Sequence, residues 1–236
     1  MNWYVGTSGY SYKEWKGPFY PEDLSPKDML RFYSSRLKTV EINNTFYRMP
    51  KESVLEEWCA EVPEEFRFVL KAPQRITHFQ RLKHTDDSLE YFLRVAGVLG
   101  TRRGPLLFQL PPQFHCDAAR LGAFLDLVPS ACRAAFEFRH ESWFTDEVFG
   151  LLKKHNCALC VAEEDDELQV PKVATADWGY LRLRRVDYTE RDLAEWAKWI
   201  AEQKWEEVYV FFKHEDEGKA PEFAQEFLKL TANERE

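Results

Sequence analysis

The chain has 236 residues and a formal net charge of −8, with 44% hydrophobic and 31% charged residues. This composition is typical of a soluble globular protein with one large core, and the acidic balance argues against a polycation that coats nucleic acid. Aromatic residues reach 15% of the chain, so rings are plentiful for packing or for stacking on a ligand.

The amino terminus, residues 1–6 (MNWYVG), has no basic segment followed by an apolar one, so it is expected to be a first strand and not a signal peptide. No apolar stretch approaches the roughly 18 residues that a membrane span needs. The five cysteines, an odd number in a chain of this size, argue against a disulfide scaffold. The sequence therefore predicts a cytoplasmic protein with no membrane partner.

Short apolar segments recur along the chain. They are as apolar as strands that are covered on both faces of a parallel sheet. The expected strands are residues 3–8, 39–44, 66–72, 105–110, 134–139, 158–163, 180–184 and 207–213.

Helical spacing and capping residues fill most of the intervals between these strands. The expected helices are residues 25–37, 52–61, 86–99, 117–127, 145–155, 189–203 and a last helix from Pro221. The interval from Glu163 to Trp178 has acids and a proline but no helical period, so we expect a loop there.

Eight strands that alternate with helices predict an α/β protein with a parallel sheet. The length fits a (β/α)8 TIM-type barrel that lacks the helix after strand six, and a doubly wound open sheet is the alternative. Because no repeat, low-complexity tract or linker interrupts the pattern, residues 1–236 are expected to form a single domain.

Several of the apolar segments end in polar residues. Because side chains alternate between the two faces of a strand, the apolar residues that face the helices leave the polar ones pointing inward. The side chains predicted to point inward are Glu41, Asn43, Lys71, Glu137, Arg139, Tyr180, Arg182 and Arg184. Gln109 stands at the end of another strand. Since the carboxyl ends of barrel strands share one rim, the sequence predicts a polar site there with an excess of positive charge.

Several short motifs are distributed over nearly the whole chain. They are residues 6–12 (GTSGYSY) with Trp15 and residues 19–21 (FYP), residues 40–48 (VEINNTFYR), residues 71–73 (KAP) with 76–78 (ITH), residues 108–112 (FQLPP), and residues 137–140 (EFRH) with 142–143 (SW). With these motifs the sequence resembles the YecE-like family, also called domain of unknown function 72 (DUF72). The resemblance implies a TIM-type barrel but no particular reaction.

Two segments depart from the family pattern. Arg184-Arg185 stand where many relatives carry His-Gly, and Lys213-His214 stand where many carry paired Asn. The site of this chain is therefore expected to be more cationic than that of those relatives.

The expected catalytic residues are Glu41, Glu137, Lys71 and His78. Two carboxylates in one pocket can divide into a general acid and a general base. Strands two and five lie roughly opposite in a barrel, so a close pair is not expected. A buried charge network, Glu41 with Lys71 and Glu137 with Arg139 or Arg182, is the alternative.

Lys71 is expected to bind an anionic substrate in preference to acting as a base or Schiff-base nucleophile. His78 and His140 follow strands and are candidates for acid–base or metal-ligand roles, although no spacing typical of a zinc site is present. The expected substrate-binding residues are Ser8, Tyr10, Trp15, Asn43, Tyr47, Gln109, Arg139, Trp143, Asp177 and Arg182.

Aromatic residues after the strands form a second group. They are Tyr10, Tyr12, Trp15, Phe46, Tyr47, Phe79, Trp143 and Trp178. On the rim they would stack sugars or bases, and the alternative is that they form small cores under the loops. Residues 157–160 (CALC) form a C-x-x-C at the opposite end of a strand, so no redox or metal role is expected there.

The favoured hypothesis is an enzyme, a hydrolase or lyase, that acts on a small phosphorylated or sugar-like anion by acid–base chemistry at the carboxyl rim. One alternative is a nucleic-acid-binding protein of phosphodiesterase type, with a metal held by Glu41, Glu137 and His78. Another is a barrel that binds a small-molecule ligand without turnover. The sequence names no cofactor.

Overall fold

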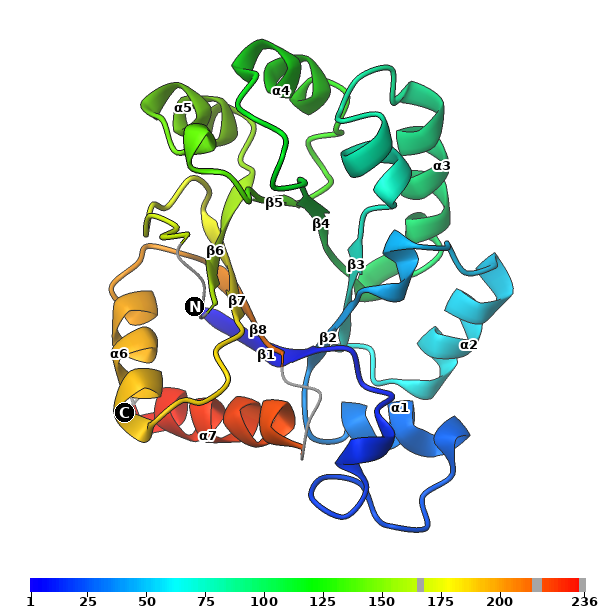
Figure 1. The fold of residues 1–236 in the computed structure, drawn as a ribbon. Coiled ribbons are helices and arrows are strands. Elements are labelled where there is room, and N and C mark those ends of the chain that lie inside the picture. Colours follow the sequence, from blue (N-terminus) through cyan, green and yellow to red (C-terminus); the bar gives the residue numbers. More distant parts are fainter. Residues whose placement is uncertain (165–167, 214–217, 234–236) are drawn as a thin grey trace.

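The computed structural model describes residues 1–164, 168–213 and 218–233. Its strands pair in parallel and in sequential order, and β1 pairs with β8 to close a barrel (Figure 1). The strands are β1 (Asn2–Ser8), β2 (Thr39–Ile42), β3 (Arg67–Lys71), β4 (Arg103–Gln109), β5 (Ala134–Glu137), β6 (Ala158–Glu163), β7 (Trp178–Leu183) and β8 (Glu207–Phe212). The TIM-type prediction is confirmed, and the open-sheet alternative is wrong.

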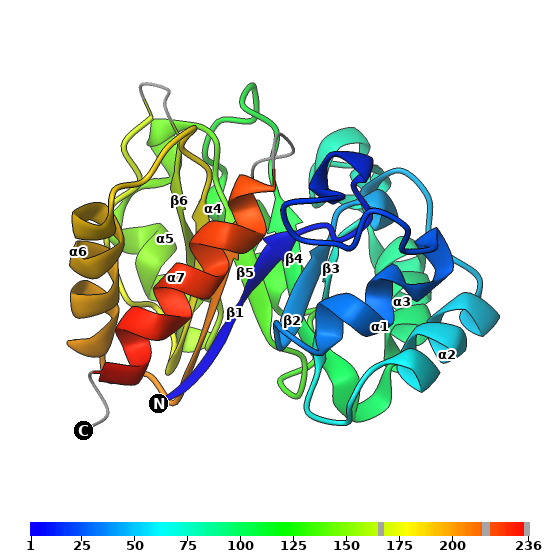
Figure 2. The same ribbon diagram turned by 90° about the horizontal axis from the view of Figure 1, so that it is seen from below.

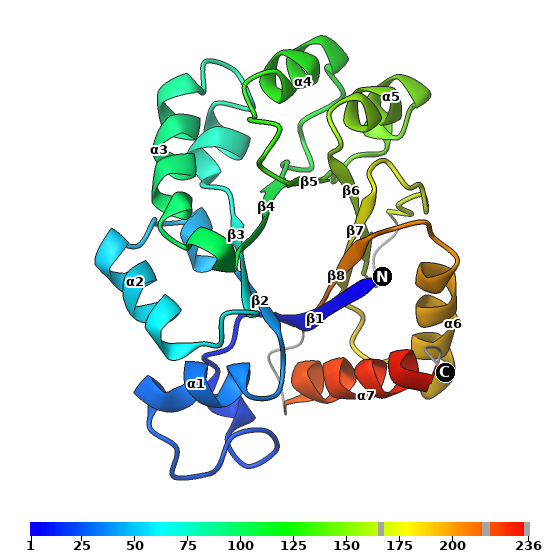
Figure 3. The ribbon, with the colours of Figure 1, turned by 180° about the vertical axis from the view of Figure 1, so that it is seen from behind.

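Helices surround the barrel, as Figures 1 and 3 show from opposite sides. They are α1 (Met29–Ser34), α2 (Glu52–Glu61), α3 (Asp86–Gly97), α4 (Ala118–Leu125), α5 (Asp146–Lys154), α6 (Glu190–Ala201) and α7 (Lys219–Asn233). Residues 164 and 168–177, the described part of the β6–β7 connection, contain no helix, as predicted. None of the helices in the described ranges is both long and apolar enough to cross a bilayer.

Capping residues fix where several helices begin. Asp117 accepts a hydrogen bond from the backbone N–H of Arg120, and Thr189 and Asp192 form a reciprocal capping box. The first helix is shorter than expected because residues 26–28 form a tight 3₁₀ turn ahead of α1.

Alternation along the strands separates two apolar layers. Leu181 and Leu183 belong to the outer layer between strands and helices. The lumen is filled by Val69, Leu107, Ala135, Ala158, Cys160, Trp178, Tyr180, Tyr209 and Phe211. Figure 2 shows the strands from the side. The barrel interior is thus a packed core over most of its height, and Glu41, Glu137 and Arg182 enter it near the carboxyl ends of their strands.

Candidate functional site

The centre of the site is a buried ion triad that spans the lumen. Arg182 of β7 donates from Nη2 to Oε1 of Glu41 at 2.8 Å and from Nη1 to Oε2 of Glu137 at 2.6 Å. The three side chains are 2%, 0% and 1% exposed, respectively. The two acids from β2 and β5 are therefore joined by one guanidinium. Of the pairings in the predicted charge network, Glu137 with Arg182 is formed, whereas no salt bridge of Glu41 with Lys71 or of Glu137 with Arg139 is found among the described residues.

Glu41 accepts three further hydrogen bonds. Ser8 Oγ donates at 2.7 Å, Asn43 Nδ2 at 3.1 Å and the Tyr180 hydroxyl at 2.5 Å. Ser8 is held in place because Gly9, with φ at +94°, turns the chain so that its N–H donates to the Glu41 carbonyl at 2.8 Å. The conformation of Gly9 is one that residues with a Cβ rarely adopt.

Glu137 accepts two hydrogen bonds in addition to the one from Arg182. Gln109 Nε2 and Arg184 Nη2 donate to its Oε1 at 2.9 and 2.8 Å. The amide oxygen of Gln109 in turn accepts from Lys71 Nζ at 2.8 Å, and Arg184 also pairs with Glu164. Hydrogen bonds therefore run continuously from Lys71 through Glu137 to Glu41.

This arrangement keeps both carboxylates ionised. Burial raises the pKa of each acid, but the Arg182 charge and the donated hydrogen bonds outweigh it and hold both pKa values below the usual range for glutamate. Burial and the Glu41 charge raise the pKa of Tyr180 well above its ordinary value, so its hydroxyl stays a donor. At neutral pH the two acids are acceptors with their oxygen atoms engaged.

Lys71 and His78 lie beside the triad and have pKa values close to or below neutrality. Burial and the Arg182 charge lower the pKa of Lys71 to about 8, in part offset by Glu137 and Glu41. Burial and then the Lys71 and Arg139 charges lower the pKa of His78 to about 4. Phe46 lies between them, with the Lys71 nitrogen 4.4 Å from its ring centre and the His78 ring 4.8 Å away.

The loop that carries His78 has an unusual backbone. Residues Arg75–Phe79 form a π-helical turn, a rare conformation that is frequently found at functional sites. Arg81, Leu82 and His84 then adopt left-handed conformations with φ of 47°, 63° and 53°. Non-glycine residues adopt this region at a cost, and such residues cluster at binding sites.

A cavity of about 110 Å³ lies next to the triad. It is lined by Pro112, Glu137, Phe138, Arg139, Ala162, Glu164, Leu168, Val170 and Arg184. The Nε atoms of Arg182 and Arg184 are buried, and neither meets an acceptor within the described ranges. Within the same ranges, no carboxylate lies within 4 Å of the charged nitrogens of Lys71 or Arg139.

The structure brings together seven of the residues expected at the site. They are Ser8, Glu41, Asn43, Lys71, Gln109, Glu137 and Arg182. Arg139 lines the adjacent cavity, and Tyr10 is partly buried near Tyr33, at a ring distance of 6.2 Å.

Asp177 and Trp178 lie at the end of the barrel opposite to the predicted binding site. β7 begins at Trp178, so both residues are at the amino end of the barrel, where Asp177 accepts from Asn156 Nδ2 at 2.9 Å. Trp178 is buried at the bottom of the lumen and donates to the Asn156 carbonyl at 3.1 Å. The expectation that they reach the carboxyl rim is wrong.

The rim aromatics divide into buried and exposed groups. Trp15 packs among rings of the first loop, and Trp143 stacks on Phe138 at 4.8 Å; both are buried. Tyr47 and Phe79 are 74% and 73% exposed. Of these four, only Tyr47 and Phe79 offer open faces to a ligand.

Two further contributors, Tyr180 and Glu164, were not given a site role by sequence reasoning. Tyr180 was expected to point inward, so strand alternation was the signal that could have found it. Glu164 belongs to the loop expected after strand six, and only the fold places it against Arg184.

The metal site of Glu41, Glu137 and His78 invoked for a phosphodiesterase is not supported. Across the residues that the structure describes, no group of three His, Cys, Asp or Glu side chains is placed to hold a metal ion. Arg182 stands between the two glutamates instead. Cys157 and Cys160 are buried free thiols, and His214 lies outside the described residues.

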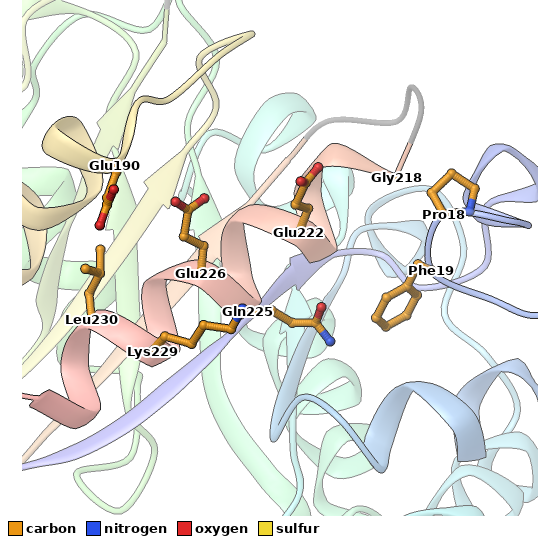
Figure 4. Close-up of a pocket in the computed structure, with 9 residues that line it drawn as sticks. All are labelled: Pro18, Phe19, Glu190, Gly218, Glu222, Gln225, Glu226, Lys229 and Leu230. Atoms are coloured by element: carbon orange, nitrogen blue, oxygen red, sulfur yellow. The ribbon is translucent and has the colours of Figure 1, made fainter.

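A larger pocket of about 750 Å³ lies outside the barrel against α7 (Figure 4). Three of its lining residues are acidic, namely Glu190, Glu222 and Glu226, and Figure 4 shows Glu222 and Glu226 extending from α7. None of the triad residues lines it, so it is separate from the candidate site.

The fold and this polar cluster define a TIM-type barrel protein with a charged site at the carboxyl ends of its strands. The family model described as "Protein of unknown function DUF72" matches residues 4–236, and the chain belongs to this family. The resemblance noted in the sequence is thereby confirmed.

Individual relatives agree with this assignment. The UPF0759 protein YunF of Bacillus subtilis (strain 168) is 27% identical over 272 residues, covering 96% of this chain and 94% of YunF. The UPF0759 protein YecE of Escherichia coli (strain K12) is 34% identical over 116 residues, covering 49% of this chain and 43% of YecE. A crystal structure of a DUF72 family protein from Thermotoga maritima has a TM-score of 0.89 at 28% identity, covering 98% of this chain and 100% of that one.

Proposed function

We propose that the carboxyl rim of the barrel binds a small anionic substrate and acts on it by acid–base chemistry. The observation that carries this proposal is Lys71, a partly buried amine whose pKa is lowered to about 8. A group with a pKa near the working pH is suited to proton transfer. In this proposal Lys71 touches the substrate and exchanges the proton.

His78 has a supporting role in the proposal. Because its pKa is lowered to about 4, the imidazole is neutral at pH 7, with one ring nitrogen a donor and the other an acceptor. Thr77 Oγ1 lies 2.9 Å from its Nδ1 and orients the ring, which leaves Nε2 for the substrate.

The two glutamates are positioning residues in this proposal. Their low pKa values make them poor proton donors at neutral pH, whereas their contacts fix Arg182 and, through Gln109, the amine of Lys71. Cations that are held in place in this way stabilise negative charge that develops on a substrate, and they do so without rearrangement.

The test is a panel of phosphorylated, carboxylated and neutral metabolites. A ligand of the native state raises the unfolding temperature by mass action, and positive compounds are then assayed for turnover. Lys71→Met is expected to abolish turnover while the protein stays folded. Lys153→Met, an exposed lysine on α5, is the matched control that leaves turnover unchanged.

Two results would refute the proposal. One is a panel in which no anion stabilises the protein more than the neutral compounds do. The other is unchanged turnover in the Lys71→Met protein. Stabilisation by an anion with no turnover by any assay would favour the ligand-binding barrel instead.

A second candidate function rests on a separate observation, the exposed rings of Tyr47 and Phe79. Each lies next to basic residues, Arg48 in one case and Arg75 and Arg81 in the other. Open rings beside cations suit stacking of single-stranded nucleic acid.

This candidate predicts binding of an oligonucleotide that weakens steeply with salt and is lost in a Tyr47→Ala, Phe79→Ala double variant. A flat salt response would rule it out. The metal-dependent phosphodiesterase form of the idea is not retained, because its ligands do not converge.

A further inference from the structure

The cavity of about 110 Å³ beside Glu137 does not have Lys71 in its lining. Its charged lining residues are Arg139, Arg184 and the two glutamates that pair with Arg184, Glu137 and Glu164. We infer that it is the subsite for one oxyanion group of the substrate, a carboxylate or a phosphoryl group, held by Arg139 and by the Nε–H of Arg184. The inference rests on the proposed function, which it deepens by assigning where the charged group of the substrate lies.

The first observation is the unpaired donor of Arg184. Its Nη2 is engaged by Glu137 at 2.8 Å and by Glu164, so the plane of the guanidinium is fixed. Its Nε is buried without an acceptor among residues 1–164, 168–213 and 218–233, and the side chain lines the cavity. A buried donor without a partner is unfavourable, so an acceptor in the cavity would be bound strongly.

The second observation is Arg139. It is partly buried, lines the same cavity from the chain just after β5, and has no carboxylate within 4 Å in the described part of the chain. A free guanidinium presents a planar fork of donors that matches a carboxylate or phosphoryl group. Arg139 and Arg184 thus offer donors from the ends of two different strands.

The size and lining of the cavity limit what it can take. At about 110 Å³ the cavity is smaller than the roughly 300–1,000 Å³ of pockets that enclose a whole small-molecule ligand. It therefore suits one charged group of a substrate. Phe138, Leu168 and Val170 supply apolar walls, which strengthen hydrogen bonds to a bound anion by lowering the local dielectric.

The cavity lies close to the proposed acid–base group. Glu137, which lines the cavity, accepts from Gln109 Nε2 at 2.9 Å, and Gln109 Oε1 accepts from Lys71 Nζ at 2.8 Å. In this inference a substrate anchored by its anion between the two arginines extends from the cavity toward Lys71.

The experiment measures the dissociation constants of inorganic phosphate and of acetate by calorimetry at fixed ionic strength. Arg139→Gln removes the guanidinium that has no carboxylate partner among the described residues. Arg184→Lys keeps the positive charge next to Glu137 but removes the Nε–H donor. Arg185→Gln is the matched control, because this neighbouring arginine pairs with Asp192 at 3.5 Å and does not line the cavity.

We expect one of the two anions to bind the wild-type protein, and each cavity variant to weaken binding about tenfold or more, as loss of a charge-assisted hydrogen bond does. Arg185→Gln should change the dissociation constant by less than about twofold. Preference for phosphate or for acetate then identifies the group that the substrate carries.

Loss of anion binding in Lys71→Met with normal binding in both cavity variants would overturn the inference and leave the proposed function standing, because the anion would then sit at the amine. Failure of both anions to bind the wild-type protein would also overturn it. The proposed function would in that case be judged by its metabolite panel alone.

Discussion

Glu41 and Glu137, from strands on different sides of the lumen, accept hydrogen bonds from the two terminal nitrogens of a single guanidinium. The barrel radius alone would keep these acids apart, and Arg182 bridges them because it reaches the centre from β7. Two buried negative charges with one central positive charge are stable only while the bridge is intact.

Removing the bridge is expected to destabilise the protein strongly. Arg182→Met leaves two buried carboxylates without their shared partner, and we expect a loss of about 3–5 kcal/mol in the free energy of unfolding. Urea denaturation measures it. Arg191→Met, which breaks an exposed pair with Glu195, should cost at most about 0.5 kcal/mol. A loss in Arg182→Met no larger than in this control would show that the triad is not a stabilising element.

The same triad predicts how stability depends on acid. Burial opposes the charged form of Glu137, but Arg182 prevails and the folded-state pKa lies below the unfolded one. The stabilising contribution is therefore fully present above the ordinary pKa of glutamate, about 4.3, and is lost as the pH falls from there toward the depressed value. Urea melts across this range should show falling stability in the wild-type protein and a shallower fall in Glu137→Gln. Parallel pH profiles for the two proteins would contradict the assignment.

The amine of Lys71 should titrate near neutrality. Its pKa is lowered to about 8 by burial and by Arg182, whereas an ordinary lysine titrates near 10.4. Reductive methylation with a ¹³C label followed by NMR reports each lysine, and one methylamine resonance, absent in Lys71→Met, should have its midpoint at about 8. A midpoint near 10 for that resonance would remove Lys71 as the proton-transfer group.

His78 should stay neutral across the physiological range. The midpoint of its ring-proton resonance is expected at about 4, since burial, Lys71 and Arg139 all oppose protonation. In Arg139→Gln the midpoint should move up toward 6.5, because one of the opposing charges is gone. An unchanged His78 midpoint in the variant would show that Arg139 does not act on the ring.

Local sequence determined much of the architecture. Residues 40–43 (VEIN) and 180–184 (YLRLR) alternate in a period of two, and this places Glu41 and Arg182 on the face of each strand opposite to residues such as Leu181, which packs in the outer layer. The cap at Asp117 and the missing helical period after Glu163 set element boundaries in the same local way.

Only the tertiary structure decided which charges meet. Arg139 and Arg182 both follow the inward alternation, yet Arg182 takes both glutamates and Arg139 lines a separate cavity, because partner choice depends on how far each strand reaches before the barrel closes. The placement of Asp177 at the opposite end has the same origin, since strand length and register are collective properties of all eight strands. Side-chain alternation is written into neighbouring residues, whereas the distance between two strands across a lumen exists only after the ring has closed.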